Sequence, residues 1–361
     1  MRLQRWMNGL LACVAAMVCG VALAQAQPSQ PAPQQTFDQA VKGEQAQRQQ
    51  AQPGNNAPMW REVRSEKEHF TSTVGRETGV LIQSGGETWR RLRNSQVIPI
   101  TGWLFVGVLG LIAAFYFAKG TMKLKESPTG RKLLRFTSIE RMTHWTVAIS
   151  FVLLAVSGLV MAFGKWILLP IIGHTLFAWL TMLLKNVHNF VGPLFSVALV
   201  VMFITFIKDN WPKGYDLQWL LKGGGMLNGE HVPSGKFNMG EKAWFWGGVF
   251  VLGIAVTITG FVLNELVPGL EYKRALMQQM NILHLVFTML FMTAFLGHAY
   301  MGTVGMEGAF NAMKTGEVDE AWAKEHHEYW YNDVKNAARA APASGAMGAI
   351  PATAAQQKHR D

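Results

Sequence analysis

The chain has 361 residues, half of them hydrophobic and only 16% charged, with a formal net charge of +10. This composition excludes an ordinary soluble domain, because the apolar residues gather in runs long enough to cross a lipid bilayer. The positive charge does not indicate nucleic-acid binding, since the basic residues lie mainly beside the apolar runs, as they do in membrane proteins.

The first 24 residues have the pattern of a secretory signal peptide. A short basic start precedes an apolar stretch, and Ala22-Leu-Ala24 matches the small-residue cleavage pattern. Cleavage after Ala26 and an uncleaved anchor are the alternatives. Both cysteines, Cys13 and Cys19, lie inside this peptide. The mature chain therefore offers no thiolate for an iron–sulfur cluster or a thioether-linked haem, so a redox cofactor must be held by histidine or methionine.

Residues 25–97 are predicted to lie outside the cytoplasm. Residues 25–58 are rich in Gln, Ala and Pro and poor in apolar residues, which is typical of disorder. Residues 80–83, followed by two glycines, predict one short strand and a turn. No chemistry is indicated in this segment, and His69 is interpreted as a solvated side chain.

Five apolar segments follow, each nearly free of charge and about 20 residues long, the length that a transmembrane helix needs. They cover residues 98–118, 144–163, 187–207, 243–263 and 280–303. The predicted fold is an all-α integral membrane helical bundle.

The loop charges agree with the orientation that a signal peptide sets. Loops 119–143 and 208–242 carry seven and five basic residues, whereas loops 164–186 and 264–279 carry two each. Basic loops stay in the cytoplasm, so the mature N-terminus is expected in the periplasm and the C-terminus in the cytoplasm. The first part of the tail, through Trp330, is expected to fold along the membrane surface, and residues 333–361 to be a disordered cytoplasmic tail.

Two histidines of the last span, His284 and His298, are fourteen residues apart. Fourteen steps of about 100° end within roughly 40° of whole turns, so both rings leave the same helix face. At about 1.5 Å per residue the rings stand roughly 21 Å apart, most of the thickness of the hydrocarbon core.

Two other histidines match them in depth. His144 and His298 lie toward the cytoplasm, and His188 and His284 lie toward the periplasm. A neutral imidazole is a good iron ligand, and a polar ring within lipid is tolerated mainly when it is paired or ligating. The pairs therefore predict two b-type haems stacked across the bilayer, with Gly158 on the face of His144 but at the depth of the other pair. Three alternatives remain, namely interfacial hydrogen-bonding histidines, a proton relay, and methionine ligation by Met142, Met280 or Met301. Four other histidines after the first span are interpreted as surface residues, namely His174, His231, His326 and His327.

A second candidate site precedes the fourth span. Asn238 and Glu241 have the spacing of a capping box at a helix start. The functional interpretation is that Asn238 and Gly240 line a quinone pocket beside the cytoplasmic haem, with Glu241 as a proton entry carboxylate.

Residues 132–332 resemble the gamma subunit, a membrane cytochrome b, of respiratory formate dehydrogenase. The resemblance is carried by Arg141-Met-Thr-His144-Trp-Thr-Val147, Ser157-Gly158, His188-Asn-Phe-Val-Gly192, Lys236-Phe-Asn238-Met-Gly240-Glu-Lys242, His284, His298-Ala-Tyr-Met301 and Trp322-Ala-Lys-Glu-His-His327. It implies a four-helix di-haem core. The signal peptide, the periplasmic segment and the extra N-terminal transmembrane helix at 98–118 look like the long form of this family. In the family the four matching histidines bind two b haems, and the matching Asn and Gly lie in the quinone pocket. This chain has Glu241 where the family usually has Gln.

The resemblance also implies a catalytic alpha subunit with molybdenum or tungsten and a beta subunit with Fe–S clusters. The chain itself would anchor them in the bacterial inner membrane and pass electrons to quinone, without oxidising formate. Cytochrome b subunits of hydrogenases and other molybdenum enzymes share the plan, so they stay alternatives. A haem-free membrane anchor or transporter is the rival from a different class.

Overall fold

A computed structural model describes residues 85–225, 230 and 232–340, with a few isolated residues between 47 and 82. The expected signal peptide, nearly all of segment 25–58, and His231 lie outside the described residues. The chain divides into two compact units, Met1–Pro99 with Glu265–Leu285, and Ile100–Asn264 with Val286–Asp361.

The first unit joins the segment before the first span to the start of the last long helix. Strands β1 (His69–Phe70) and β2 (Val80–Ile82) pair antiparallel, so the strand expected at 80–83 is present. Helix α4 (Gly86–Arg91) continues into a π-helical stretch, η1 (Leu92–Val97). The indole of Trp89 donates to Gln278 O at 3.1 Å and Arg93 Nε donates to Asn281 Oδ1 at 2.8 Å. Both acceptors lie on α11 (Arg274–Tyr300), so this unit holds α4 and η1 against the helix that carries His284.

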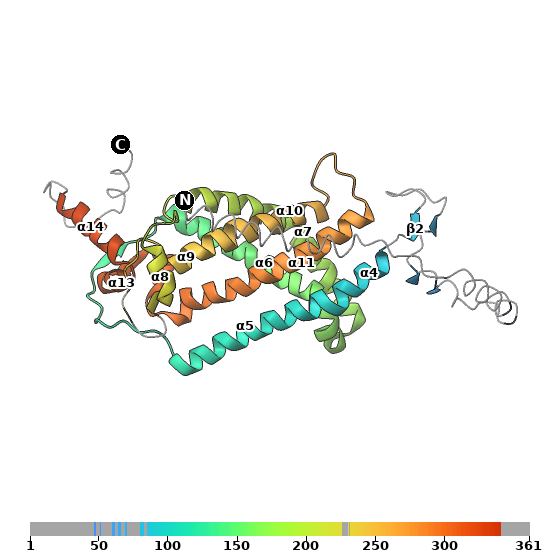
Figure 1. The fold of residues 1–361 in the computed structure, drawn as a ribbon, viewed down its shortest axis with the longest axis horizontal. Coiled ribbons are helices and arrows are strands. Elements are labelled where there is room, and N and C mark those ends of the chain that lie inside the picture. Colours follow the sequence, from blue (N-terminus) through green and yellow to red (C-terminus); the bar gives the residue numbers. More distant parts are fainter. Residues whose placement is uncertain are drawn as a thin grey trace. The chain divides into compact units, whose positions relative to one another are not determined.

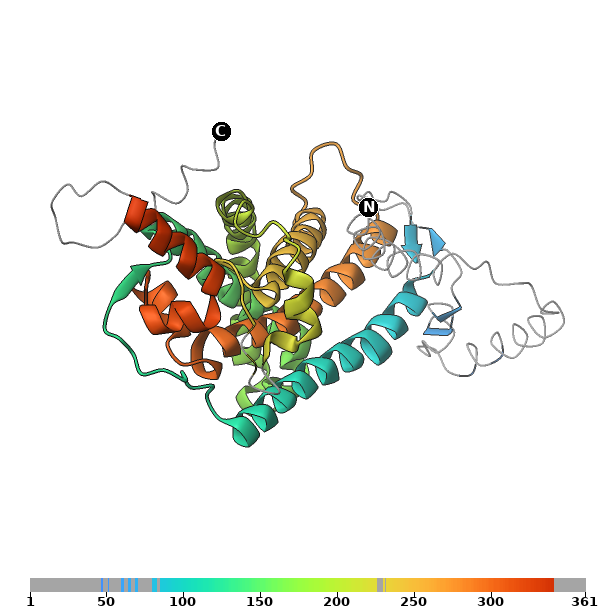
Figure 2. The ribbon, with the colours of Figure 1, turned by 60° about the vertical axis from the view of Figure 1, so that its left-hand side comes forward.

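Long apolar helices make up most of the second unit (Figures 1 and 2). Their bounds are α5 (Ile98–Lys119), α6 (Ser138–Ile167), α7 (Leu169–Phe206), α9 (Met239–Ala243), η3 (Trp244–Leu252) and α10 (Gly253–Leu263), with the second half of α11. Among the described residues, five helices are long and apolar enough to cross a membrane: Gly86–Lys119, Ser138–Ile167, Leu169–Phe206, Met239–Leu263 and Arg274–Gly305. The predicted all-α membrane helical bundle is confirmed.

The segment 164–186 is expected to be a loop but is almost entirely helical in the structure. Helix α6 runs to Ile167 and α7 begins at Leu169, with one break at Gly173, whose backbone has φ 75° and ψ 171°. Glycine adopts this conformation without steric cost, so the chain turns there and resumes the helix at once. The large apolar side chains of the segment have no charged neighbours in sequence other than Lys165 and Lys185, which lets the helices extend beyond the expected spans.

Phenylalanines fill the middle of the bundle. Phe151 of α6 lies 4.8 Å from Phe291 of α11 and 6.2 Å from Phe195 of α7, measured between ring centroids, and all three side chains are buried. Phe151 and Phe195 each come seven residues after a predicted haem ligand, and Phe291 lies seven residues from both His284 and His298. Seven helical residues rise about 10 Å, so the rings form an aromatic layer midway between the two histidine levels.

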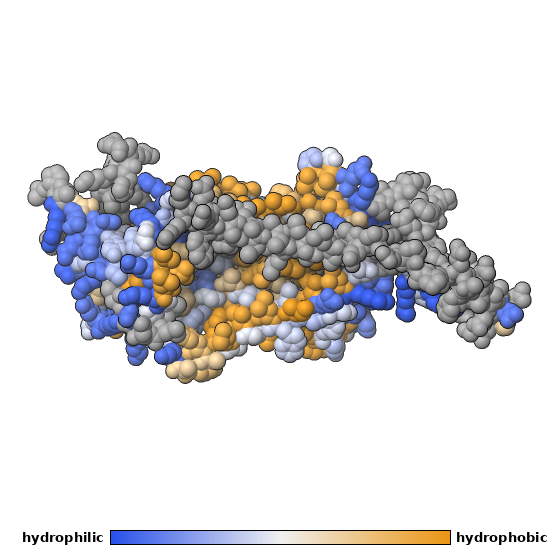
Figure 3. All heavy atoms as spheres, in the orientation of Figure 1, coloured by the Kyte–Doolittle hydropathy of each residue, from blue (hydrophilic) through white to orange (hydrophobic). Residues whose placement is uncertain are grey.

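One end of the second unit is polar (Figure 3). Its elements are β3 (Lys132–Leu134), α8 (Asp216–Leu221), η2 (Gly223–Gly225), η4 (Met301–Gly305), α12 (Ala309–Lys314), β4 (Glu317–Asp319), α13 (Glu320–His326) and α14 (Glu328–Ala340). Strands β3 and β4 pair antiparallel, with Leu133 opposite Val318.

The C-terminal tail is ordered further than the sequence predicts. Residues 333–340, expected in a disordered tail, are the second part of α14. This helix buries Trp330, Tyr331 and Val334 along one side. An apolar stripe at helical spacing stabilises the helix by packing, which overrides the Ala-rich, weakly patterned sequence that follows.

Candidate functional site

The structure brings His144 and His298 together. His144 lies in the second turn of α6 and His298 near the end of α11, and their ring centroids are 6.2 Å apart with an interplanar angle of 52°. Nδ1 of His144 is buried and has no hydrogen-bond partner among the described residues. Trp244, the first residue of η3, stacks on His298 at 4.8 Å with the ring planes 12° apart.

This spacing fits one iron atom held between two imidazoles. A metal–nitrogen bond of about 2 Å, with roughly 1 Å from the nitrogen to the centre of its ring, places two opposite imidazole centroids about 6 Å apart. The donor set is also suitable, since neutral imidazoles are the usual nitrogen ligands of haem iron. The residues present at this level therefore fit a bis-histidine haem.

The second level is carried by His188 on α7. Ser157 of α6 lies against it, with 2.7 Å between Ser157 Oγ and His188 Nδ1. A Cβ atom added at Gly158 would lie 3.7 Å from His188 Cε1, so Gly158 faces this histidine, as its spacing from His144 predicts. At Gly192, one turn after His188, an added Cβ would meet no atom within 4 Å. His284 lies in the first unit and His188 in the second, so the pairing of these two rings stays a prediction.

Asn238 is the N-cap of α9. Its Oδ1 accepts from Glu241 N at 3.0 Å, while Glu241 Oε2 accepts from Asn238 N at 2.8 Å, which completes the capping box. The other carboxylate oxygen of Glu241 accepts from Arg135 Nη2 at 2.9 Å. A Cβ atom on Gly240 would lie 3.0 Å from the Trp219 ring, so this position accepts only glycine without a shift of its neighbour.

Two lysines anchor the segment that contains Asn238. Lys236 Nζ lies 2.8 Å from Glu140 Oε1 and 2.7 Å from Asp209 Oδ2. Lys242 Nζ lies 2.7 Å from Asp216 Oδ2, and both of these side chains are almost fully buried. Because a buried charge is tolerated only when it is paired, these contacts fix the start of α9 relative to α6 and α8.

His327 is buried, which corrects its interpretation as a surface residue. Its side chain is 1% exposed and lies beside Trp322, with 5.0 Å between ring centroids. Nδ1 donates to Gly235 O at 2.7 Å. Burial and the Arg135 guanidinium lower the pKa of His327 to about 3, so the ring is neutral. The reason is tertiary, because α13 folds back onto the segment before Asn238. His326 is half-buried, whereas His174 is exposed as expected.

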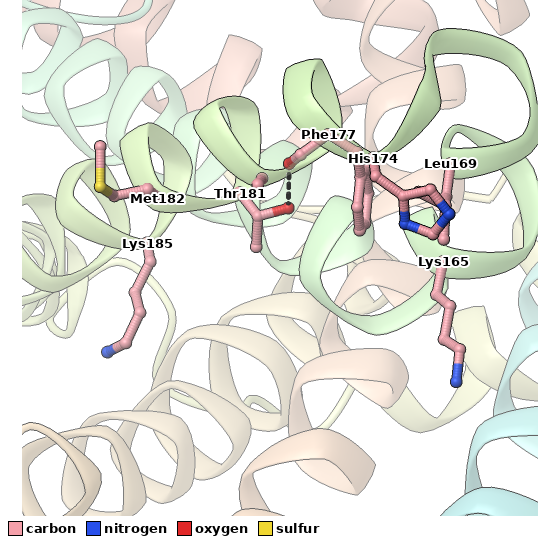
Figure 4. A pocket seen from close by; sticks show the side chains of 8 residues that line it. Lys165, Leu169, His174, Phe177, Thr181, Met182 and Lys185 are labelled. Atoms are coloured by element: carbon pink, nitrogen blue, oxygen red, sulfur yellow. Dashed lines mark hydrogen bonds between the residues drawn. The ribbon is translucent and has the colours of Figure 1, made fainter.

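A pocket lies where α6 meets α7 (Figure 4). Its lining includes Lys165, His174, Phe177 and Lys185, and Thr181 Oγ1 donates to Phe177 O at 2.7 Å. None of the eight residues that line it is a predicted haem or quinone residue.

Three contacts of the site were not anticipated from the sequence. In the sequence Arg135 is one of several loop charges, but in the fold it is 4% exposed and holds Glu241. Ser157 belongs to a short motif and Trp244 to an apolar span, and neither pattern indicates a histidine partner. A buried arginine next to aromatic residues has no periodic signal, so only the fold reveals its partner.

Residues 135–316, half of the chain, match the family described as prokaryotic cytochrome b561. The chain belongs to this family. It is a multi-pass membrane cytochrome that holds b-type haem, and the His144–His298 geometry fits that cofactor.

Curated relatives of this cytochrome include the cytochrome b556(Fdn) subunit of the nitrate-inducible formate dehydrogenase of Escherichia coli (strain K12). It is 29% identical over 216 residues, which are 57% of this chain and 94% of the relative. The cytochrome b556(fdo) subunit of formate dehydrogenase from the same strain is 28% identical over 206 residues, 56% of this chain and 93% of the relative. The formate dehydrogenase cytochrome b556 subunit of Haemophilus influenzae is 25% identical over 211 residues, 56% of this chain and 83% of the relative.

Proposed function

We propose that this chain is the membrane cytochrome b subunit of a respiratory formate dehydrogenase. The relatives that match it over most of their own length are named as subunits of that enzyme. When bound, b haem supplies one-electron transfer, here from an Fe–S subunit to quinone. The chain therefore anchors the complex and reduces quinone, while formate oxidation belongs to its partner.

The chain holds two haems in this proposal, with His144 and His298 as one ligand pair and His188 and His284 as the other. The observation that carries it is the 6.2 Å between the rings of His144 and His298, which come from two different helices. The second pair is supported by the fourteen-residue phase of His284 and His298 along α11. The aromatic layer of Phe151, Phe195 and Phe291 is buried and lies between the two levels.

The quinone site is placed at Asn238, Gly240 and Glu241. Two observations support it: Asn238 is the N-cap of α9, and Trp244, which begins η3 directly after α9, stacks on His298. The segment therefore lies beside the first ligand pair. The capping box uses only Oδ1 of Asn238, which leaves its amide NH₂ as a donor to a quinone carbonyl. Glu241 provides a carboxylate near that donor, and Arg135 holds this carboxylate in place. In this proposal protons enter at Glu241.

The partners in this proposal are an alpha subunit with molybdenum or tungsten and a beta subunit with Fe–S clusters, both on the periplasmic side. The complex lies in the bacterial inner membrane. In this proposal the polar end of the second unit lies in the cytoplasm, together with His144, His298 and the quinone site, and the basic loops support this orientation. The level of His188 and His284 then faces the periplasmic partner, and a haem held there would be the first to take electrons from it.

The test is a set of reduced-minus-oxidised spectra of membranes that contain the complete complex. Formate should reduce the b-type absorption, and hydrogen should not. The variant His188→Ala should lose one haem and keep the other, and His144→Ala should lose the other spectral component. His174→Ala, at an exposed position, is the control and should keep both.

Other outcomes would overturn specific parts of the proposal. Absence of b-type absorption would support the haem-free anchor or transporter instead. Reduction by hydrogen alone would assign the chain to a hydrogenase, and loss of the same component in both variants would overturn the pairing.

A further inference from the structure

Ser157 is a residue of α6, and its side chain faces His188 of α7. Its side chain is fully buried, at 0% exposure, and its hydroxyl lies 2.7 Å from His188 Nδ1. Two carbonyl oxygens of its own helix are also within reach, Leu153 O at 2.8 Å and Leu154 O at 3.0 Å.

These distances decide which atom donates. A serine hydroxyl has one hydrogen but can accept two bonds, whereas a carbonyl oxygen can only accept. If the hydroxyl donated to His188, its oxygen would face two carbonyl oxygens with no hydrogen between them. The hydroxyl therefore donates to its helix backbone, and the short contact with His188 is an Nδ1–H donating to Ser157 Oγ.

The direction of this bond fixes the state of the histidine. In a neutral imidazole one nitrogen carries the hydrogen and the other carries the lone pair. With the hydrogen on Nδ1, the lone pair is on Nε2, which is the nitrogen that binds iron in the proposed ligand role. The bond also holds the ring at one rotation, because Ser157 is itself held by the backbone of α6.

We propose that Ser157 is a positioning residue for haem ligation: beside the Leu154 carbonyl, which also bonds this ring, its hydroxyl favours the Nδ1–H tautomer of His188 and increases the donor strength of that imidazole toward iron. The inference rests on the proposed ligand role of His188. An acceptor on the distal N–H makes an imidazole a stronger ligand, and a stronger ligand favours ferric iron. The hydroxyl therefore lowers the reduction potential of one haem.

His144 offers the contrast within the same helix. Its Nδ1 is buried and accepts or donates no hydrogen bond among the described residues. The effect of Ser157 is thus confined to the His188 level. The haem of lower potential is therefore the one held at the His188 level, toward the proposed electron donor. The haem of higher potential is the one beside the quinone site.

The experiment compares two substitutions of equal shape in the intact complex. Ser157→Thr keeps the hydroxyl and Ser157→Val replaces it with a methyl group, so any packing effect of the added carbon is common to both. Ser150→Ala is the matched control, because Ser150 is also buried on α6 and also bonds its own helix, to Thr146 O and Val147 O, with no histidine beside it. The readouts are haem content, potentiometric titration of each haem, and the electron paramagnetic resonance signal of the ferric form.

Ser157→Val should raise the reduction potential of one haem, or lower its content, while the other haem, Ser157→Thr and Ser150→Ala stay as in the wild type. If both variants retain both haems, equal potentials in the Thr and Val variants would overturn the proposal, as would an equal shift of both haems in the Val variant. If both bulky variants lose haem through steric conflict, Ser157→Ala decides by the same comparison with Ser150→Ala. A His188→Ala variant that retains both haems would instead overturn the ligand assignment itself.

Discussion

Asn238 shows how one side chain can have a structural role and still be available for another. Its Oδ1 caps α9, and its backbone N–H is bonded by Glu241, so the capping interpretation of this motif is correct. The cap accounts for the oxygen of the amide but not for its NH₂ group. The structural and functional interpretations therefore concern different atoms of the same residue, and a substitution can separate them.

We expect Asn238→Asp and Asn238→Ser to keep the helix start, because Asp and Ser cap as well as Asn. Both remove the amide donor, so quinone reduction should fall, roughly tenfold for the loss of about 1.4 kcal/mol of hydrogen bonding. Haem reduction by formate should be unchanged. Measuring the two activities separately checks this prediction.

Asn238→Ala provides the stability reference, with an expected loss of about 1 kcal/mol from the missing cap. Normal quinone turnover in the Asp and Ser variants would contradict the quinone site and leave Asn238 as a cap alone.

At the scale of elements, the polar end is held together by a few buried polar contacts. Gly316 O accepts from Arg135 N at 2.8 Å and from Phe136 N at 3.1 Å, which extends the β3–β4 pairing toward α6. Ser234 Oγ donates to His326 O at 2.7 Å, and His327 Nδ1 donates to Gly235 O at 2.7 Å. These bonds attach α13 to the segment that leads into Asn238, so protonation of His327 acts on the whole junction.

The neutral state of His327 makes this junction sensitive to acid. Its pKa falls from 6.5 to about 3 on folding, so between these values the unfolded chain binds a proton that the folded chain does not. The free energy of unfolding therefore decreases as the pH falls below about 6.5, by at most about 1.4 kcal/mol per pH unit from this group.

The test is the thermal midpoint of the purified protein in detergent between pH 7 and pH 4. His327→Asn keeps a donor for Gly235 O but cannot titrate, so its midpoint should fall less than that of the wild type over this range. The exposed His174→Asn is the control and should follow the wild type. Parallel curves for wild type and His327→Asn would contradict the prediction.

At the scale of the whole molecule, the charge of the loops sets the direction of electron flow. The segments 119–143 and 208–242 carry most of the loop lysines and arginines, and both belong to the polar end with β3 and α8. Basic segments are retained in the cytoplasm, so the hairpin around Gly173 is expected in the periplasm.

Reporter fusions test this topology. Alkaline phosphatase, which is active only after export, should be active when fused after Gly85 or Gly173 and inactive after Asp361. A green fluorescent protein at Asp361 should fluoresce, since it matures in the cytoplasm. The reverse pattern would invert the sides of both histidine pairs and with them the proposed direction of electron transfer.

The sequence by itself determined the membrane class, the five apolar spans and the proximity of His144 to His298. These follow from run length and from the fixed rise and rotation of a helix, which are local and periodic properties. The capping box at Asn238 was likewise visible, because it depends on residues three positions apart.

Only the tertiary structure decided which polar groups meet. The Ser157–His188 contact joins residues 31 apart, and His327 meets Gly235 across 92 positions. Such pairs leave no periodic signal, since they depend on how helices pack and not on the spacing within one helix. For the same reason His327 reads as a surface residue in the sequence and is a buried one in the fold, where α13 covers it.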